Sequence, residues 1–282
     1  MKKFLVFCLF CGLVSSSFAI SVGDTFIKNS RFWQNKFSLN FFSGDTALAG
    51  LEFDFTEHRD IEEHILAFRA PFMLNFPLVD FVFEPFFYPN TNNDTWAYGG
   101  SVTIKGILRD NEITNTSSLG YLKASFANQS ANITRTVSPL NKENFRQLTF
   151  EGGLNLNFSN LFVFDLGGNI FNYPDNVDNV ITFNGVMNQQ EMGNLGTIDY
   201  VLALPRFSAG GGITWLSSEN NAKSFISYRY IGYEQNLTTH SVMVNTMIPV
   251  DNNVIVTLTY NHLFETHKTN RDLFGVGINY LF

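Results

Sequence analysis

The sequence of 282 residues has little cysteine, little charge and no long apolar run beyond its first residues. Both cysteines, Cys8 and Cys11, lie near the amino terminus, so the rest of the chain can form no disulfide, thiolate nucleophile or cysteine metal site. No later segment reaches the roughly 18 consecutive apolar residues of a membrane helix. Charged residues make up 15% of the chain, the net charge is −7, and no basic patch stands out, so nucleic acid is not an expected partner.

The amino terminus has the three parts of a secretory signal peptide. Lys2 and Lys3 are positive, an apolar stretch runs from Phe4 to Val14, and Ser17 and Ala19 are small residues at −3 and −1 of a cleavage site. The apolar stretch is shorter than the roughly 20 residues that span a bilayer as a helix. We therefore expect export through the inner membrane and cleavage after Ala19, which would change the net charge from −7 to −9.

Aromatic residues are abundant, at 16% with 31 Phe, yet the mean hydropathy is −0.00. Strands that alternate apolar and polar residues produce this combination. The clearest example runs from Gln147 to Phe171 around a turn at Ser159-Asn160, and its two runs have the length of a tilted membrane strand. One face carries Leu148, Phe150, Leu154, Leu156, Phe158, Phe162, Phe164, Leu166 and Ile170, and the other carries Glu151, Asn155, Asn157, Asp165 and Asn169.

The carboxyl-terminal segment has an apolar or aromatic residue at every second position from Phe274 to Phe282. This alternating strand resembles the last strand of bacterial outer-membrane β-barrel proteins. Small or polar residues, Gly275, Gly277 and Asn279, alternate with an apolar face. The resemblance implies a Gram-negative outer membrane, with its lipid, the barrel-assembly machinery and periplasmic chaperones as partners. The alternative is an edge strand of a secreted β-sandwich. The candidate assembly signal comprises Phe274, Val276, Ile278, Tyr280 and Phe282.

The fold class predicted is all-β: one transmembrane antiparallel up-and-down barrel of about twelve strands within 47–282, with ten or fourteen as alternatives. Residues 20–46 would form an N-terminal arm, part of a plug, or two extra strands. Asp60 and Glu63 resemble a helix capping box, so a short helix over 60–69 is an alternative to a strand there. The strand count predicts short periplasmic turns, and it places long external loops at 127–146 and 172–204.

Eleven charged residues are predicted to face the lumen. They would either pair with one another inside a narrow barrel or form a charged constriction that selects solutes. Glycines on the same face, Gly99, Gly153, Gly167, Gly210 and Gly212 among them, would leave room for long side chains or a ligand. The candidates are Glu52, Asp54, Arg69, Asp80, Glu84, Lys105, Lys123, Glu151, Asp165, Arg206 and Arg229.

No catalytic, metal or cofactor site is predicted. The outer-membrane phospholipases use a closely spaced His–Ser pair with an Asn, and here Asn261-His262 is followed by no serine, while His240 and Ser241 fall on opposite strand faces. The acids and histidines that a protease barrel needs occur at 54–64 without a recognisable motif. The histidines are expected near the outer rim, as solvated loop residues.

Loop 172–204 is the main functional candidate because loops of this length in compact folds are usually functional or disordered. Folded inward it would narrow a channel, and extended outward it would form a recognition surface. The sequence therefore predicts a small passive channel or solute transporter. The alternatives are a structural or surface-interaction barrel with a closed lumen and, third, an outer-membrane enzyme.

Overall fold

The computed structural model describes residues 18–28, 32–43, 46–58, 63–89, 96–111, 116–135, 138–158, 161–175, 180–188, 198–201, 204–217, 221–234, 236–265 and 271–282. These residues form β-strands and their connections. None of the described segments is a helix long and apolar enough to cross a membrane. The strands are β1 (Phe18–Lys28), β2 (Phe32–Ser43), β3 (Ala47–His58), β4 (Glu63–Arg69), β5 (Phe72–Asn75), β6 (Val79–Tyr88), β7 (Trp96–Asn111), β8 (Thr116–Arg135), β9 (Ser138–Phe158), β10 (Phe162–Asn172), β11 (Val180–Asn188), β12 (Ile198–Val201), β13 (Pro205–Leu216), β14 (Lys223–Tyr233), β15 (Thr238–Pro249), β16 (Val254–Glu265) and β17 (Arg271–Leu281).

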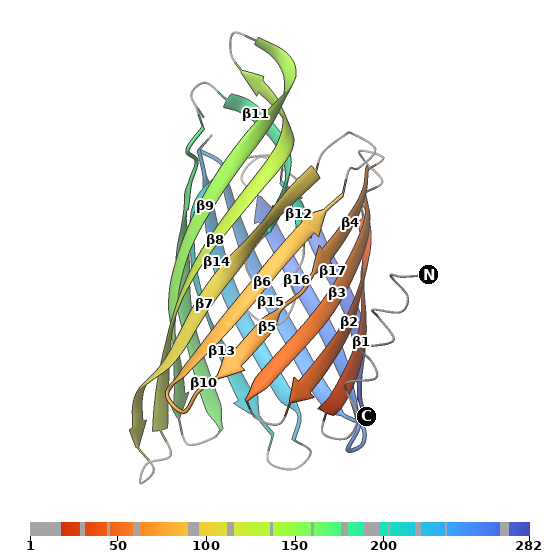
Figure 1. Ribbon diagram of the computed structural model, residues 1–282, viewed down its shortest axis with the longest axis vertical. Coiled ribbons are helices and arrows are strands. Elements are labelled where there is room, and N and C mark those ends of the chain that lie inside the picture. Colours follow the sequence, from red (N-terminus) through yellow and green to blue (C-terminus); the bar gives the residue numbers. More distant parts are fainter. Residues whose placement is uncertain are drawn as a thin grey trace, which may run out of the picture.

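The strands form one antiparallel sheet that closes on itself (Figure 1). Closure is made by β1, which pairs with β2 on one side and with β17 on the other. β4 and β5 share a single place between β3 and β6, separated by Ala70 and Pro71. The carbonyl of Pro71 still accepts a hydrogen bond from the Gly50 amide at 2.7 Å, so the wall continues across the break. The closed sheet excludes the β-sandwich alternative.

The barrel wall has fourteen strands, the upper of the expected alternatives. The two beyond twelve are β1 and β2, so the described part of 20–46 belongs to the wall and is not a separate arm or plug. Residues 63–69 form strand β4 instead of a helix. Cross-strand pairing explains this, because Phe68 lies opposite Phe53 with ring centroids 5.3 Å apart. Residues 60–62 lie outside the described residues.

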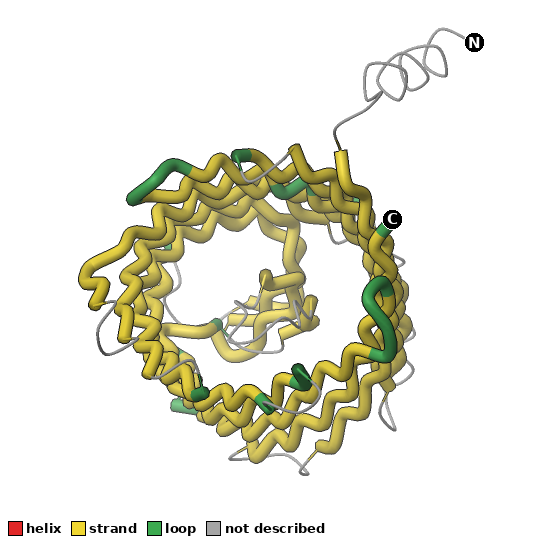
Figure 2. Tube along the Cα trace, turned by 90° about the horizontal axis from the view of Figure 1, so that it is seen from below, coloured by secondary structure: helices red, strands yellow, loops and turns green. Residues whose placement is uncertain are grey.

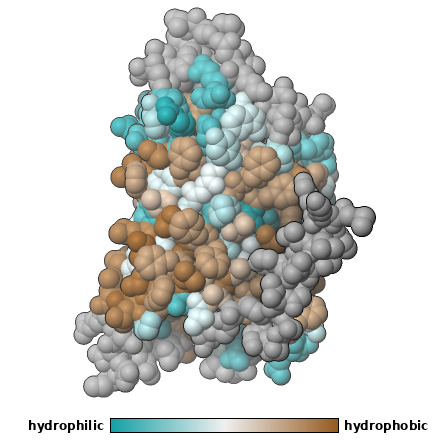
Figure 3. Space-filling model, viewed as in Figure 1, coloured by the Kyte–Doolittle hydropathy of each residue, from teal (hydrophilic) through white to brown (hydrophobic). Residues whose placement is uncertain are grey.

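The apolar residues of the wall face outward. On β10, the side chain of Ile170 is 65% exposed while that of Asn169, its neighbour in sequence, is 4% exposed. Figure 3 shows apolar residues gathered over the body of the barrel, with hydrophilic residues toward its upper end. Alternation therefore gives a wall that suits lipid outside and a polar lumen inside.

The two ends of the barrel differ. The C-terminus lies at the end where connections such as 76–78 and 250–253 are short. At the opposite end, residues 127–146 are mostly strand, because β8 and β9 stay paired from Thr116↔Phe158 to Arg135↔Ser138. The expected loop there is thus a β-hairpin that rises beyond the rim (Figure 1).

The segment between β10 and β13 leaves the wall and returns to it. β10 pairs directly with β13, while β11 pairs with the edge of β8 and β12 pairs with β11. Along the barrel axis, strand segments lie within the outline of the wall (Figure 2). In Figure 1, β12 lies at the height of the wall strands, below the raised end of the β8–β9 hairpin. The segment expected as loop 172–204 therefore carries two strands of its own, β11 and β12.

Candidate functional site: the barrel lumen

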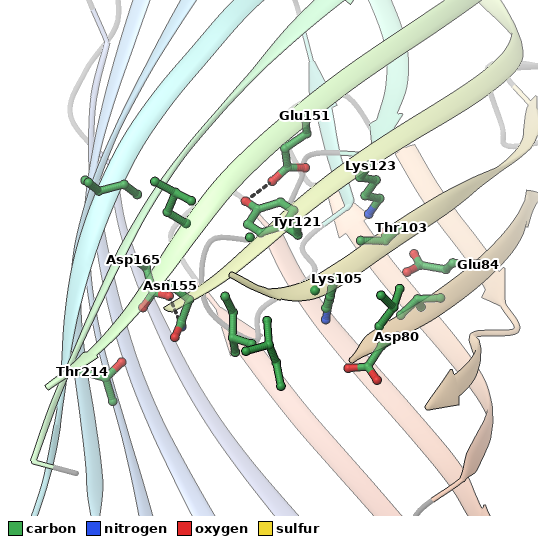
Figure 4. Close-up of a pocket in the computed structure, with 18 of the residues that line it drawn as sticks. Asp80, Glu84, Thr103, Lys105, Tyr121, Lys123, Glu151, Asn155, Asp165 and Thr214 are labelled. Carbon is green, nitrogen blue, oxygen red and sulfur yellow. Dashed lines mark hydrogen bonds between the residues drawn. The ribbon is translucent and has the colours of Figure 1, made fainter. Parts of the chain in front are cut away.

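A cavity of about 740 Å³ occupies the lumen toward the end with short turns. Residues from β4 around the wall to β15 line it, and Figure 4 shows the charged side chains pointing into it. The structure brings together seven of the eleven charged residues predicted to face the lumen. They are Arg69, Asp80, Glu84, Lys105, Lys123, Glu151 and Asp165.

Strand register explains why these side chains meet. Thr103, Lys123 and Glu151 lie opposite one another on β7, β8 and β9. The same row continues through Asn169 on β10 and Ser208 on β13. Because residues in one row share a face of the sheet, alternation within each strand is enough to place the whole row inside the lumen.

Tyr121 on β8 lines the cavity, and its hydroxyl donates a hydrogen bond to Oε1 of Glu151 at 2.7 Å. The row beside it consists of Gly153 on β9 and Gly167 on β10. A Cβ at Gly153 would lie 2.3 Å from the Tyr121 ring, and one at Gly167 would lie 2.8 Å from its hydroxyl. The glycines therefore make room for a long side chain. Tyr121 was absent from the sequence candidates, and the glycines opposite it were the available signal.

The other lumen groups have partners as well. Asn155 donates to Asp165 at 2.7 Å, and the Ser208 hydroxyl donates to the Asn169 amide oxygen at 2.6 Å. Arg229 on β14 acts electrostatically on both Glu151 and Tyr121. Two ion pairs also lie on this face: Lys36 with Glu52 at 3.0 Å, and Arg69 with Glu84 at 4.0 Å. Asp54, at 1% exposed, is buried on β3.

Arg206 departs from its predicted place in the lumen. A register shift between Pro205 and Phe207 interrupts the alternation where β13 begins. The side chain of Arg206 is 67% exposed and lies 3.9 Å from Glu234 at the rim. The irregularity at Pro205 therefore removes Arg206 from the lumen-facing row of β13.

Toward the outer rim the lumen contains aromatic and apolar residues. Phe86 and Tyr88 on β6 pack with Ala67 and Ala97 in a buried cluster. At the rim, the buried ring of Phe145 on β9 contacts Tyr173, with centroids 5.2 Å apart.

Tyr173 also donates a hydrogen bond to the Pro205 carbonyl at 2.6 Å, and Leu204 is fully buried. Asp175 binds Arg146 at 2.9 Å, and this hydrogen bond holds the pKa of Asp175 below its usual range. We call Phe145, Tyr173, Leu204 and the Arg146–Asp175 pair the rim contacts. They fasten both ends of the segment between β10 and β13 to the outer rim.

The described histidines make contacts with different partners. Among the described residues, no three His, Cys, Asp or Glu side chains are placed to hold a metal ion. His240 hydrogen bonds to Tyr228 at 2.6 Å, whereas Ser241 donates to Asn261 at 2.8 Å, so His240 and Ser241 serve different contacts. His262 lies 2.6 Å from Asp272. His267 falls outside the described residues.

Comparisons with known proteins relate this chain to outer-membrane barrels by fold alone. No family model and no curated protein matches the sequence. Among solved structures, the CymD monoaromatic hydrocarbon channel is 12% identical, with a TM-score of 0.57 over 95% of this chain and 89% of that one. The Pseudomonas putida toluene transporter TodX is 10% identical, with a TM-score of 0.51 over 96% of this chain and 90% of that one. The chain thus has the fold of an outer-membrane β-barrel channel.

Proposed function

We propose that this protein is a small passive channel through which polar solutes cross the outer membrane. The observation that carries the proposal is the charged cavity of about 740 Å³ enclosed by a wall whose outer face is apolar. Charged side chains in the lumen of a membrane barrel are the usual means by which a pore admits or rejects solutes. Four of the charges lining the cavity are Lys105, Lys123, Asp80 and Asp165, so water and polar solutes suit it better than apolar ones.

The fold neighbours support a channel, since one is described as a hydrocarbon channel and another as a toluene transporter. We propose a polar solute instead of a hydrocarbon, because ionic groups line the cavity of this chain. The rim contacts place three bulky side chains, Phe145, Tyr173 and Leu204, at the outer end. We infer that the pore is narrow.

Export and assembly form part of the proposal. We infer that residues 1–19 are removed and that the barrel-assembly machinery inserts the remainder. The β1–β17 pairing begins at Ser21↔Leu281, so cleavage after Ala19 would preserve every one of these pairs.

Thiol labelling of two neighbouring residues on β13 tests the channel. Thr214 lines the cavity, whereas Ile213 is 41% exposed on the outer face. With Cys8 and Cys11 replaced by Ser, the variants Thr214→Cys and Ile213→Cys each carry one thiol. In a planar bilayer we expect ion current from both, and a charged methanethiosulfonate reagent should reduce the current of Thr214→Cys alone. Equal responses, or no current from the unmodified protein, would contradict a lumen pathway.

One observation favours a second candidate function, a surface-interaction barrel. The β8–β9 hairpin rises beyond the rim and carries β11 on its edge, which gives the outer end a strand surface outside the membrane wall. A protein that assembles fully but conducts no ions would support this function.

A further inference from the structure

Two lysines project into the cavity from neighbouring strands, Lys105 from β7 and Lys123 from β8 (Figure 4). Lys105 lies opposite Tyr121, and Lys123 lies two residues further along the same strand, opposite Thr103. The two lysines are therefore diagonal neighbours on one face, at the spacing where long side chains interact. Among the residues that the structure describes, neither lysine forms an ion pair.

The carboxylates of the cavity are mostly engaged by other groups. Glu84 faces Arg69, and Asp165 accepts from Asn155. Glu151 accepts from Tyr121 and lies near both Lys123 and Arg229. Lys105 and Lys123 also have carboxylates as cross-strand neighbours, Asp80 and Glu151. Neither lysine forms an ion pair with its neighbouring carboxylate, so the three N–H donors of each ammonium are available to a solute in the cavity.

Two adjacent like charges that form no ion pair repel one another, and an anion placed between them lowers the energy of that repulsion. A carboxylate is the common biological anion that accepts several such hydrogen bonds, and charge-assisted bonds of this kind are the strong ones. The Thr103 hydroxyl, opposite Lys123, adds a neutral donor beside the pair.

We propose that Lys105 and Lys123 form a binding site for small dicarboxylate anions inside the lumen. Each ammonium binds one carboxylate end, and the cavity of about 740 Å³ holds the remainder of the solute. This site rests on the proposed function in that it names the class of solute which the channel would admit.

Equilibrium dialysis with radiolabelled succinate tests the site without requiring conduction. We expect the folded protein in detergent to bind succinate, and the double variant Lys105→Gln/Lys123→Gln to bind it at least tenfold more weakly. Lys28→Gln is the matched control, because Lys28 is exposed at the end of β1 and does not line the cavity. Its binding should equal that of the unmodified protein. Heat-modifiable migration of each variant shows that its barrel is folded.

Three results would overturn the proposal: no succinate binding by the unmodified protein, equal binding by the double variant, or the same loss in Lys28→Gln. Current measurements in a planar bilayer distinguish failure of the binding site from failure of the channel proposal. Current without succinate binding would refute the site and leave the channel, whereas lysine-dependent binding without current would refute the channel and leave the site.

Discussion

At the scale of single residues, the lumen shows how a barrel tolerates charge inside a membrane. A buried carboxylate is costly unless it is paired or hydrogen bonded. Glu151 is 8% exposed, and its hydrogen bond from Tyr121 is of the kind that contributes about 1.5–3 kcal/mol when one partner is charged. Gly153 and Gly167 make that bond possible, because any larger residue at either position would collide with Tyr121.

The two faces of the wall should respond oppositely to added charge. Phe164 on β10 faces outward at 37% exposed, whereas Thr214 on β13 lines the cavity. We expect Phe164→Arg to lower the free energy of unfolding by roughly 2–4 kcal/mol if it lies near the midplane, since the charge enters lipid. Thr214→Arg should cost much less, because the guanidinium reaches the aqueous lumen. Urea titration of both variants in lipid vesicles measures the difference.

Similar losses in the two variants would show that the register is misassigned. Asn169 is a lumen residue on the strand of Phe164, and the sequence alone would favour it as the mild position. It is unsuitable, because its side chain is buried and accepts the hydrogen bond from Ser208.

At the scale of elements, the outer end is formed by strands that extend beyond the barrel wall. β8 and β9 continue past the last pair between β9 and β10, Leu148↔Asn172. β8 also continues past its last pair with β7, Trp96↔Ser130, and β11 covers the open edge there by pairing with residues 132–135. Covering an edge removes a row of unpaired backbone groups that would otherwise recruit another chain.

Deleting 177–195 should therefore open the outer end. The deletion removes β11 but keeps Tyr173 and Leu204, so the wall strands β10 and β13 stay joined. We expect single-channel conductance to rise several-fold, because the shortened connection leaves less chain at the outer end of a fourteen-stranded barrel. Far-UV circular dichroism and heat-modifiable migration serve as controls for assembly. An unchanged conductance would mean that this segment does not narrow the pore.

At the scale of the whole molecule, stability depends on closing the sheet between its first and last strands. The pairing of β1 with β17 runs from Ser21↔Leu281 to Lys28↔Phe274. The amide of Phe282 extends it by donating to the Ile20 carbonyl at 2.8 Å, and its ring contacts Tyr280 with centroids 4.5 Å apart. Because the β1–β17 pairing closes the sheet, β17 is required for the structure of the barrel.

Deletion of Phe282 should impair assembly of the barrel while leaving export intact. The terminal aromatic residue belongs to the predicted assembly signal, and it also makes the last hydrogen bond of the closing pair. We expect less membrane-inserted, heat-modifiable protein, with processing to the form beginning at Ile20 unchanged. Phe282→Trp, which keeps an aromatic end, should restore the yield. Normal yield from the deletion would argue against a role of this residue in assembly.

Alternation by itself determined the barrel and its outward apolar face, because a strand of period two commits each residue to one side. It also placed seven charged residues at the cavity, since cross-strand rows follow from alternation. Features that depend on partners distant in sequence were decided only by the tertiary structure. β1 and β2 belong to the wall because they pair with β17 and β3. The register shift after Pro205 turns Arg206 toward the rim. The contact of Tyr121 with Glu151 likewise required β8 and β9 to lie side by side, which no local pattern specifies.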